Sequence, residues 1–493
     1  MKRFGKAVAV AAAVLVFFAG CASNSGMDSG ADSSKKEKKA KEKKSKDSKK
    51  KGGFDAEAFN EAYAARDYDT CIALLSEKNA GAVLNGLDTA MLEYMKSDYM
   101  TSAKDFVQLQ QDMQQLTADM SAGKVMEAAL IGENSVEYVG NTYERIFAYS
   151  MKAVNALKMG ETDRAVGVFN EYTGNYKAEI ADLVAQQKEI AAQSESAVDD
   201  PKVASAIDAL GAIGMNVNIG EMTANKPSSS DEMYDASAFL AYLGTLTYLA
   251  NDDAQHAEDF AGVLASTGSA IDVSEDLNIA DGMGRLDVIA LTDVIGKRSE
   301  GAVEGSLGEV LPASNINVVY KIAYPTFEPQ NHAINVAKVT LSNGEAKDFV
   351  LIEDFDEAVK KDVAQKASGA FGRSVFRNVV KNSAAVVGSY AALKAASEQV
   401  QKASNPVQQK AAEKAYEAAV VGLNVALEAV VDMEKADVRQ AAFFPNKASA
   451  TGFTVEPGTY TVTVEYTNGK TDVIENVAVK AGKPTVVVSE CMN

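Results

Sequence analysis

The chain has 493 residues, of which 47% are hydrophobic and 24% are charged, a composition typical of folded protein. Its formal net charge of −19 argues against a general nucleic-acid-binding protein, because such proteins carry a basic surface. Three cysteines and two histidines are too few for a disulfide framework or a Cys-rich zinc module. At about 100–200 residues per domain, the length allows about three domains.

The first 20 residues have the layout of a secretory signal peptide. A basic start, Met1–Lys6, precedes the apolar run Ala7–Phe18, which is shorter than the about 20 residues that a membrane-spanning helix needs. Phe18-Ala19-Gly20-Cys21 resembles a bacterial lipobox, with Phe18 where Leu is usual. We therefore predict residues 1–20 to be a lipoprotein signal peptide and Cys21 to carry acyl chains such as palmitate. The alternative is a plain signal peptide cleaved nearby, with Cys21 incidental.

Residues 21–53 form a Lys-rich stretch without aromatic residues until Phe54. Such a segment buries too little apolar surface to fold, so we expect a disordered tether. Residues 1–20 carry a charge of +3 and residues 21–51 carry +6, which leaves −28 on the rest. We interpret the tether as a solvated spacer; the alternative is that its lysines touch an anionic surface. No Asp follows Cys21, which favours the outer membrane, facing the periplasm.

Residues 54–270 show helical periodicity in pairs. The clearest unit, Tyr143–Tyr176, has two apolar stripes separated by a Gly-containing turn, with Ala165 and Phe169 four residues apart in the second. This pattern resembles the tetratricopeptide repeat, in which a small residue lets paired helices approach closely. Weaker units of the same kind are Phe59–Ser76, Leu87–Leu109 and Phe239–Leu264. We predict a repeat-type solenoid with a concave face that binds proteins; the alternative is an irregular helical bundle.

Residues 271–355 and 441–493 show strand patterns. Asn343-Gly344 and Asn468-Gly469 each lie between alternating apolar runs, which is a strong hairpin signal. The predicted strands include Asn315–Tyr324, Val336–Leu341, Lys347–Ile352, Thr459–Tyr466 and Thr471–Glu475. We therefore predict a mainly α protein with a smaller β part, in which a solenoid precedes a β-sandwich-like domain.

Residues 356–440 interrupt the β part with a predicted helical hairpin. Asp356–Ala403 and Pro406–Ala436 have helical patterns, and Pro406 suits the first position of a helix. Tyr416–Val431 has only two charges, so membrane insertion is an alternative. Its length is below the about 20 residues of a membrane span, and we favour a soluble hairpin.

Candidate chemical motifs are weak. Asp281–Asp287 (DGMGRLD) matches half of a dinucleotide-binding fingerprint, but the third glycine is absent. Asp276, Asn278 and Asp281 suggest calcium, yet their spacing does not fit an EF-hand. His256 and His332 have no second ligand at metal spacing. We predict no enzyme activity and no catalytic, cofactor or metal site, and a Cys71–Cys491 bridge stays open as a minor alternative.

Several phrases together resemble an uncharacterised family of bacterial envelope lipoproteins with degenerate tetratricopeptide repeats. They are Tyr138–Arg145 (YVGNTYER), Lys152–Gly160 (KAVNALKMG), Tyr320–Pro325 (YKIAYP), Glu434–Arg439 (EKADVR) and Pro457–Tyr460 (PGTY). The resemblance implies a structural or accessory role at the envelope, and the lipid site Cys21 is the residue that it carries over. Our leading hypothesis is a non-catalytic interaction scaffold that is held to the membrane by its lipid and binds unidentified envelope proteins, but no nucleic acid, through its tetratricopeptide-like repeats. The alternative is a lipoprotein that binds a solute or glycan through its C-terminal half.

Overall fold

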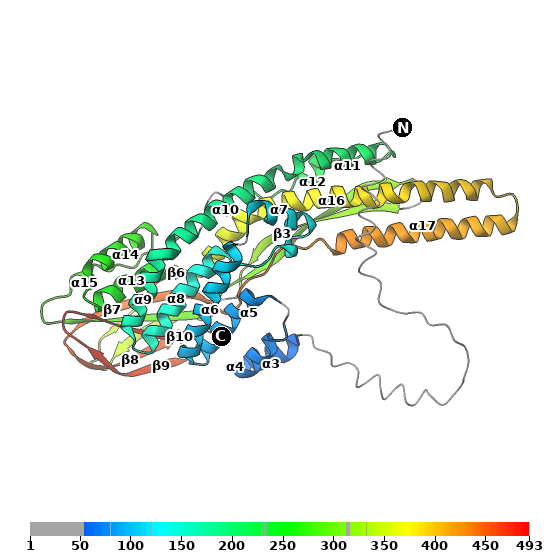
Figure 1. Ribbon diagram of the computed structural model, residues 1–493. Helices are drawn as coiled ribbons and strands as arrows, with labels where there is room; N and C mark the ends of the chain where they lie inside the picture. The colour runs from blue at the N-terminus through cyan, green and yellow to red at the C-terminus, as the bar shows by residue number, and fades with distance from the viewer. Residues whose placement is uncertain are drawn as a thin grey trace, which may run out of the picture.

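The computed structural model describes residues 54–492, except residues 79, 119, 229, 231, 233, 312–315 and 332. The predicted signal peptide, the predicted lipid-attachment residue Cys21 and the predicted tether lie outside the described residues. The described chain is mainly helical with a smaller β part, as the sequence predicts. Helices and sheets form an elongated body from which a helical hairpin projects (Figure 1).

Helix pairs make up much of the N-terminal half. The two helices of each pair pack against each other, and the second helix of a pair packs against the first helix of the next. The pairs are α3 (Ala56–Ala64) with α4 (Tyr68–Leu75), α5 (Ala82–Met95) with α6 (Tyr99–Ala118), α8 (Thr142–Lys158) with α9 (Thr162–Glu171), and α13 (Ala238–Ala250) with α14 (Ala254–Ser266). The helix–turn–helix units predicted from the sequence are thus confirmed.

The turns within these pairs share one backbone geometry. In each turn one residue adopts a positive φ, which is 59° at Arg66, 67° at Ser97, 72° at Gly160 and 60° at Asp252. The acidic residue that follows begins the second helix. In three pairs its side chain accepts a hydrogen bond from the backbone N–H three residues later, which caps the helix. These caps are Asp67, Asp98 and Asp253.

Further helices lie between the pairs and alongside the β part. They are α7 (Ala122–Ile131), η1 (Glu133–Ser135), η2 (Tyr172–Tyr176), α10 (Lys177–Glu195), η3 (Ser196–Asp199), α11 (Pro201–Gly211), α12 (Ile219–Thr223) and α15 (Ser274–Leu277). Both α10 and α11 pack along the long helix α16 (Phe355–Lys402). These insertions make the spacing of the pairs irregular.

Two four-stranded sheets form a sandwich. The first has the order β10-β1-β7-β6, with β10 (Pro484–Cys491) parallel to β1 (Gly284–Val294), whereas β7 (Pro445–Val455) and β6 (Val350–Asp354) run antiparallel to their neighbours. The second has the order β5-β4-β8-β9, formed by β4 (Val336–Leu341), β5 (Ala346–Lys347), β8 (Gly458–Tyr466) and β9 (Thr471–Val479). An apolar cluster lies between the two sheets and includes Leu286, Val339, Val462 and Val477.

The first sheet is the middle layer of the molecule. Residues Gly284–Asp293 of β1 are all buried, so this strand is covered on both faces. Leu286 and Val288 face the second sheet, whereas Ile289 and Leu291 join the core of the helix pairs. The repeats and the C-terminal half therefore share one continuous core rather than two separate ones.

The long hairpin consists of α16 and α17 (Pro406–Asp432), and it matches the predicted helices to within a few residues. A two-stranded ribbon, β2 (Lys297–Val310) with β3 (Ile316–Glu328), lies along α16 near its base (Figure 1). No described residue is buried from Ser397 to Ala411, and we call this stretch the hairpin tip. None of the described helices is long and apolar enough to cross a membrane.

Candidate functional site

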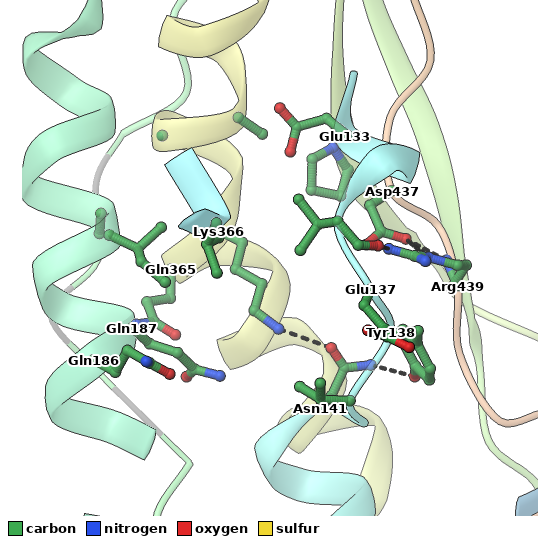
Figure 2. Close-up of a pocket in the computed structure, with 18 of the residues that line it drawn as sticks. Glu133, Glu137, Tyr138, Asn141, Gln186, Gln187, Gln365, Lys366, Asp437 and Arg439 are labelled. Atoms are coloured by element: carbon green, nitrogen blue, oxygen red, sulfur yellow. Dashed lines mark hydrogen bonds and ion pairs between the residues drawn. The ribbon is translucent and has the colours of Figure 1, made fainter. Parts of the chain in front are cut away.

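A cavity of about 160 Å³ lies where the helical and β parts meet (Figure 2). The segment between η1 and α8 forms one wall and α10 forms another, with α16 between them. Strand β2 and the segment after α17 contribute further side chains. We call this space the junction cavity and define it by Tyr138, Asn141, Gln187, Arg298, Lys366 and Asp437.

Asp362 of α16 holds two cationic side chains at the junction cavity. One carboxylate oxygen lies 2.9 Å from Nη1 of Arg298, and the other lies 2.8 Å from Nζ of Lys366. Both cations also donate to Oδ1 of Asn141, at 2.9 and 2.7 Å respectively. Asp362 and Arg298 are buried, whereas Lys366 reaches into the cavity toward Asn141 (Figure 2). One carboxylate therefore pairs with two cationic side chains here, and Asp437 adds negative charge nearby.

The two cations respond differently to this environment. Burial disfavours the charged form of Arg298, but Asp362, together with smaller effects of Tyr143 and Asp437, outweighs burial and raises the pKa of this guanidinium. Desolvation lowers the pKa of Lys366, although Asp362 acts in the opposite direction. The charge on Lys366 is therefore sensitive to what occupies the cavity, since a nearby anion favours the ammonium form.

A hydrogen-bonded cluster around Glu144 ties the cavity wall to the C-terminal half. Glu144 lies in the first turn of α8, and its carboxylate accepts hydrogen bonds from the hydroxyl of Tyr138 and, at 2.7 Å, from the backbone N–H of Asn141. Its other oxygen accepts from the N–H of Ala441 at 2.6 Å. Burial raises the pKa of Glu144, and these donors oppose the rise. The cluster fixes the position of the loop that carries Asn141.

A second buried ion cluster connects the cavity wall to the base of the hairpin. Glu133 lies 2.7 Å from Arg373 and 2.7 Å from Arg377, and Arg377 also pairs with Glu434 just after α17. Burial would raise the pKa of Glu133, but the two guanidinium groups outweigh it and lower the pKa. Every charge in this cluster has a partner of opposite sign. We therefore interpret the cluster as a structural contact that holds η1, α16 and the segment after α17 together.

The inner face of the helix pairs is covered by the chain's own C-terminal half. The N–H of Ala442 donates to Asp88 of α5 at 2.7 Å. The ring centroid of Phe443 lies 6.0 Å from that of Phe59, and the centroid of Phe444 lies 5.6 Å from that of Phe147. The expected concave face is thus an internal packing surface and is not open to a peptide.

The predicted motifs do not converge on one site. Cys71 and Cys491 are buried and free, so the structure contains no bridge between them. Nδ1 of His256 lies 2.7 Å from Asp253 near the surface, and His332 lies outside the described residues. No group of three His, Cys, Asp or Glu residues that could hold a metal occurs in the described part of the chain.

The dinucleotide-like and calcium-like motifs have other roles. Gly284 begins the central strand β1 instead of a glycine-rich loop, and Asp276 lies 2.7 Å from Nε of Arg285. Burial and the neighbouring Asp276 raise the pKa of Asp287 well above its ordinary range. These residues form a buried ion cluster between α15 and β1.

Sequence reasoning missed the charges at the junction cavity. A signal was present on α16, where Asp362 and Lys366, and then Arg373 and Arg377, recur four residues apart in a stretch whose other residues pack in the interior. No local pattern singles out Arg298, because strand β2 has a mixed sequence. The cluster therefore became visible only in three dimensions.

Three of the phrases used for the family resemblance meet at the junction cavity. Tyr138 and Asn141 come from the first phrase, Pro325 ends the YKIAYP phrase, and Asp437 and Arg439 come from EKADVR. Family models, curated proteins and solved structures give no match to this chain. The function must therefore be argued from the cavity and its chemistry.

Proposed function

We propose that this protein is a lipid-anchored bacterial envelope lipoprotein that binds a small solute in the junction cavity without transforming it. The observation that carries the proposal is the ammonium group of Lys366, which reaches into a cavity bounded by helix, strand and loop. Small-molecule sites are typically concave and mostly apolar, with a few converging polar groups. The lipobox-like sequence ending at Cys21 supports attachment to a membrane.

The fixed partners of the charged groups favour binding over catalysis. Asp362 is shared by two cations, and Asp437 lies 2.8 Å from Arg439. Glu144 accepts hydrogen bonds from backbone N–H groups on two segments. A general acid or base must exchange a proton with the substrate, whereas these carboxylates are occupied in holding the walls of the cavity.

Filling the cavity tests the proposal. Ala191 of α10 lines the junction cavity, whereas Ala192 is exposed on the same helix. The full-length lipidated protein in mild detergent is heated with and without a low-molecular-weight extract of the producing bacterium. We expect the extract to raise Tm for the wild type and for Ala192→Leu but not for Ala191→Leu. An equal rise in all three proteins, or no rise in the wild type, contradicts solute binding in this cavity.

A second candidate function is an interaction scaffold that binds through the projecting hairpin, in place of the helix pairs through which the sequence predicts binding. The projecting hairpin favours it, because α17 exposes Val421 and Val425 although both are apolar. A photocrosslinking residue at Val421 should then join one envelope protein in intact cells, whereas the same residue at Val473 on β9 should not. Equal crosslinking from both positions would speak against a specific contact by the hairpin.

A further inference from the structure

Two cationic side chains at the junction cavity share one carboxylate as their ion-pair partner. Arg298 and Lys366 face the single carboxylate of Asp362, and Arg439 is paired with Asp437. The adjacent Glu144 is already occupied by hydrogen bonds from the hydroxyl of Tyr138 and from the backbone N–H groups of Asn141 and Ala441. Glu137, at the edge of the cavity, is exposed to solvent and contributes little in the interior.

One buried donor at the cavity has no acceptor, and the ammonium group of Lys366 is partly exposed. Nε of the buried Arg298 has no acceptor among the described residues. An ammonium group has three donors, and the described residues provide Nζ of Lys366 with two acceptors, on Asp362 and Asn141. An unpaired buried donor is costly, so an anionic oxygen that reaches Nε of Arg298 would satisfy a group that is otherwise unsatisfied.

The wall of the cavity on the α10 side is largely apolar. Leu183 and Ile190 line it at a spacing of two helical turns, and Met120 and Val125 extend the apolar surface. Gln187 lies nearby on the same helix and faces the space between α10 and Asn141 (Figure 2). A ligand that fits this cavity therefore has an anionic end and an apolar body.

Size and charge restrict the ligand further. A cavity of about 150 Å³ accommodates benzene, so the about 160 Å³ here suits a molecule of about six to eight non-hydrogen atoms. Because the carboxylates of Asp362 and Asp437 lie beside the cations, a singly charged carboxylate suits the cavity better than a phosphate dianion. An apolar wall also contributes nothing to binding of inorganic phosphate.

We propose, on the basis of the proposed function, that the junction cavity binds a short-chain monocarboxylate. Its carboxylate lies against Lys366 and Arg298, and its hydrocarbon chain lies along Leu183 and Ile190 of α10. Asp362 acts as a positioning residue, since it holds both cations in place by ion pairs. The ligand is thus recognised by charge-assisted hydrogen bonds to its carboxylate and by apolar packing of its hydrocarbon chain.

The test compares three probes on the full-length lipidated protein by calorimetry: hexanoate, its uncharged analogue hexanamide, and inorganic phosphate. We expect hexanoate to bind at least about tenfold more tightly than hexanamide, because hydrogen bonds to a charged group are stronger than those to a neutral one. Phosphate should bind more weakly than hexanoate. Equal affinity for hexanoate and hexanamide, or preference for phosphate, would overturn the monocarboxylate assignment.

Paired lysine variants locate the charge. Lys366→Met retains the aliphatic stem and leaves Asp362 paired with Arg298, so we expect the fold to persist and the affinity for hexanoate to fall about 10- to 100-fold. Lys360→Met removes a more exposed ammonium from the same helix and should leave the affinity unchanged. Unchanged affinity in Lys366→Met would overturn the inference.

The cavity-filling pair separates the two proposals. In one outcome, the wild type binds hexanoate and hexanamide with equal affinity and Ala191→Leu binds neither. The cavity then binds solutes, but the inferred selectivity for a charged ligand is wrong. If the bacterial extract raises Tm in the wild type while no carboxylate binds, the solute belongs to another class. If Ala191→Leu binds hexanoate as the wild type does, the carboxylate lies elsewhere and the inference is wrong.

Discussion

Gly244 lies in the middle of α13, where the ring of Phe260 from α14 fills the space that a side chain would need. A Cβ atom at Gly244 would lie 2.4 Å from that ring, a distance that forces the two helices to move apart. Glycine normally weakens a helix by about 1 kcal/mol relative to alanine. Its presence here is explained by the close approach of the paired helices.

Gly244→Ala should therefore lower the free energy of unfolding by about 1–3 kcal/mol, as overpacking typically does. Gly262→Ala on α14 is the matched control, because nothing lies within 4 Å of a Cβ there. That change should raise the free energy of unfolding by up to about 1 kcal/mol. Urea unfolding of both variants measures the difference, and equal stability of Gly244→Ala and wild type would contradict this packing.

Asp88 introduces a pH dependence into the packing of the helix pairs. Burial raises its pKa to about 7, although the N–H of Ala442 opposes the rise. A carboxyl group whose pKa is higher in the folded state than in the unfolded state destabilises the fold as pH rises through that interval. As pH rises from about 4 to about 7, the ionisation of Asp88 lowers the free energy of unfolding by up to about 4 kcal/mol.

Asp88→Asn removes this titration and retains an oxygen that can accept from Ala442. Relative to wild type, we expect Asp88→Asn to gain stability at pH 8 and to show little gain at pH 4. Urea unfolding at the two pH values measures the difference between the proteins, which cancels the other titrating groups. A constant difference at both pH values would show that Asp88 keeps an ordinary pKa.

At the scale of elements, the burial of α16 decreases along its length. From Ala367 to Val379 every residue is buried, and the helix there packs against α10, α11 and β3. At the hairpin tip, residues 397–411, no described residue is buried. One continuous helix thus serves as core at its base and as a free arm at its end.

Amide hydrogen exchange should follow this gradient. Few buried contacts and exposed backbone hydrogen bonds give low local stability, so the hairpin tip should exchange at least about tenfold faster than residues 367–379. Exchange followed by mass spectrometry on the full-length protein measures both segments at once. Equal protection along α16 would mean that something covers the tip in solution.

The elements differ in how far they could be predicted. Helix α17 was predictable because Asn405 and Pro406 are local signals, and the side chain of Asn405 does cap the helix. Strands β1 and β7 were not, because β1 pairs with β10 almost 200 residues away and is buried on both faces, so that its sequence does not alternate between apolar and polar residues. The junction cavity was missed for the same reason, since Asn141, Arg298 and Lys366 come from three distant segments.

At the scale of the whole molecule, the helix pairs and the C-terminal half depend on each other. Residues Thr142–Ala156 of α8 are all buried, which an amphipathic repeat helix at an open surface would not show. β10 contacts both α8 and α13, and Nζ of Lys158 lies 2.9 Å from Glu490. The last strand of the chain therefore completes the core of its first half.

This dependence predicts the behaviour of the two halves when they are separated. Residues 54–270 expressed alone would expose the apolar face of α8 and should retain helix content but unfold without a cooperative transition and bind a hydrophobic dye. Co-expression with residues 271–493 should restore one cooperative transition, because the shared core can then form between the fragments. Circular dichroism with thermal melting and dye fluorescence distinguishes the two states. A sharp, cooperative transition of residues 54–270 alone, without dye binding, would show that the repeats have a core of their own and would reopen their inner face to an external partner.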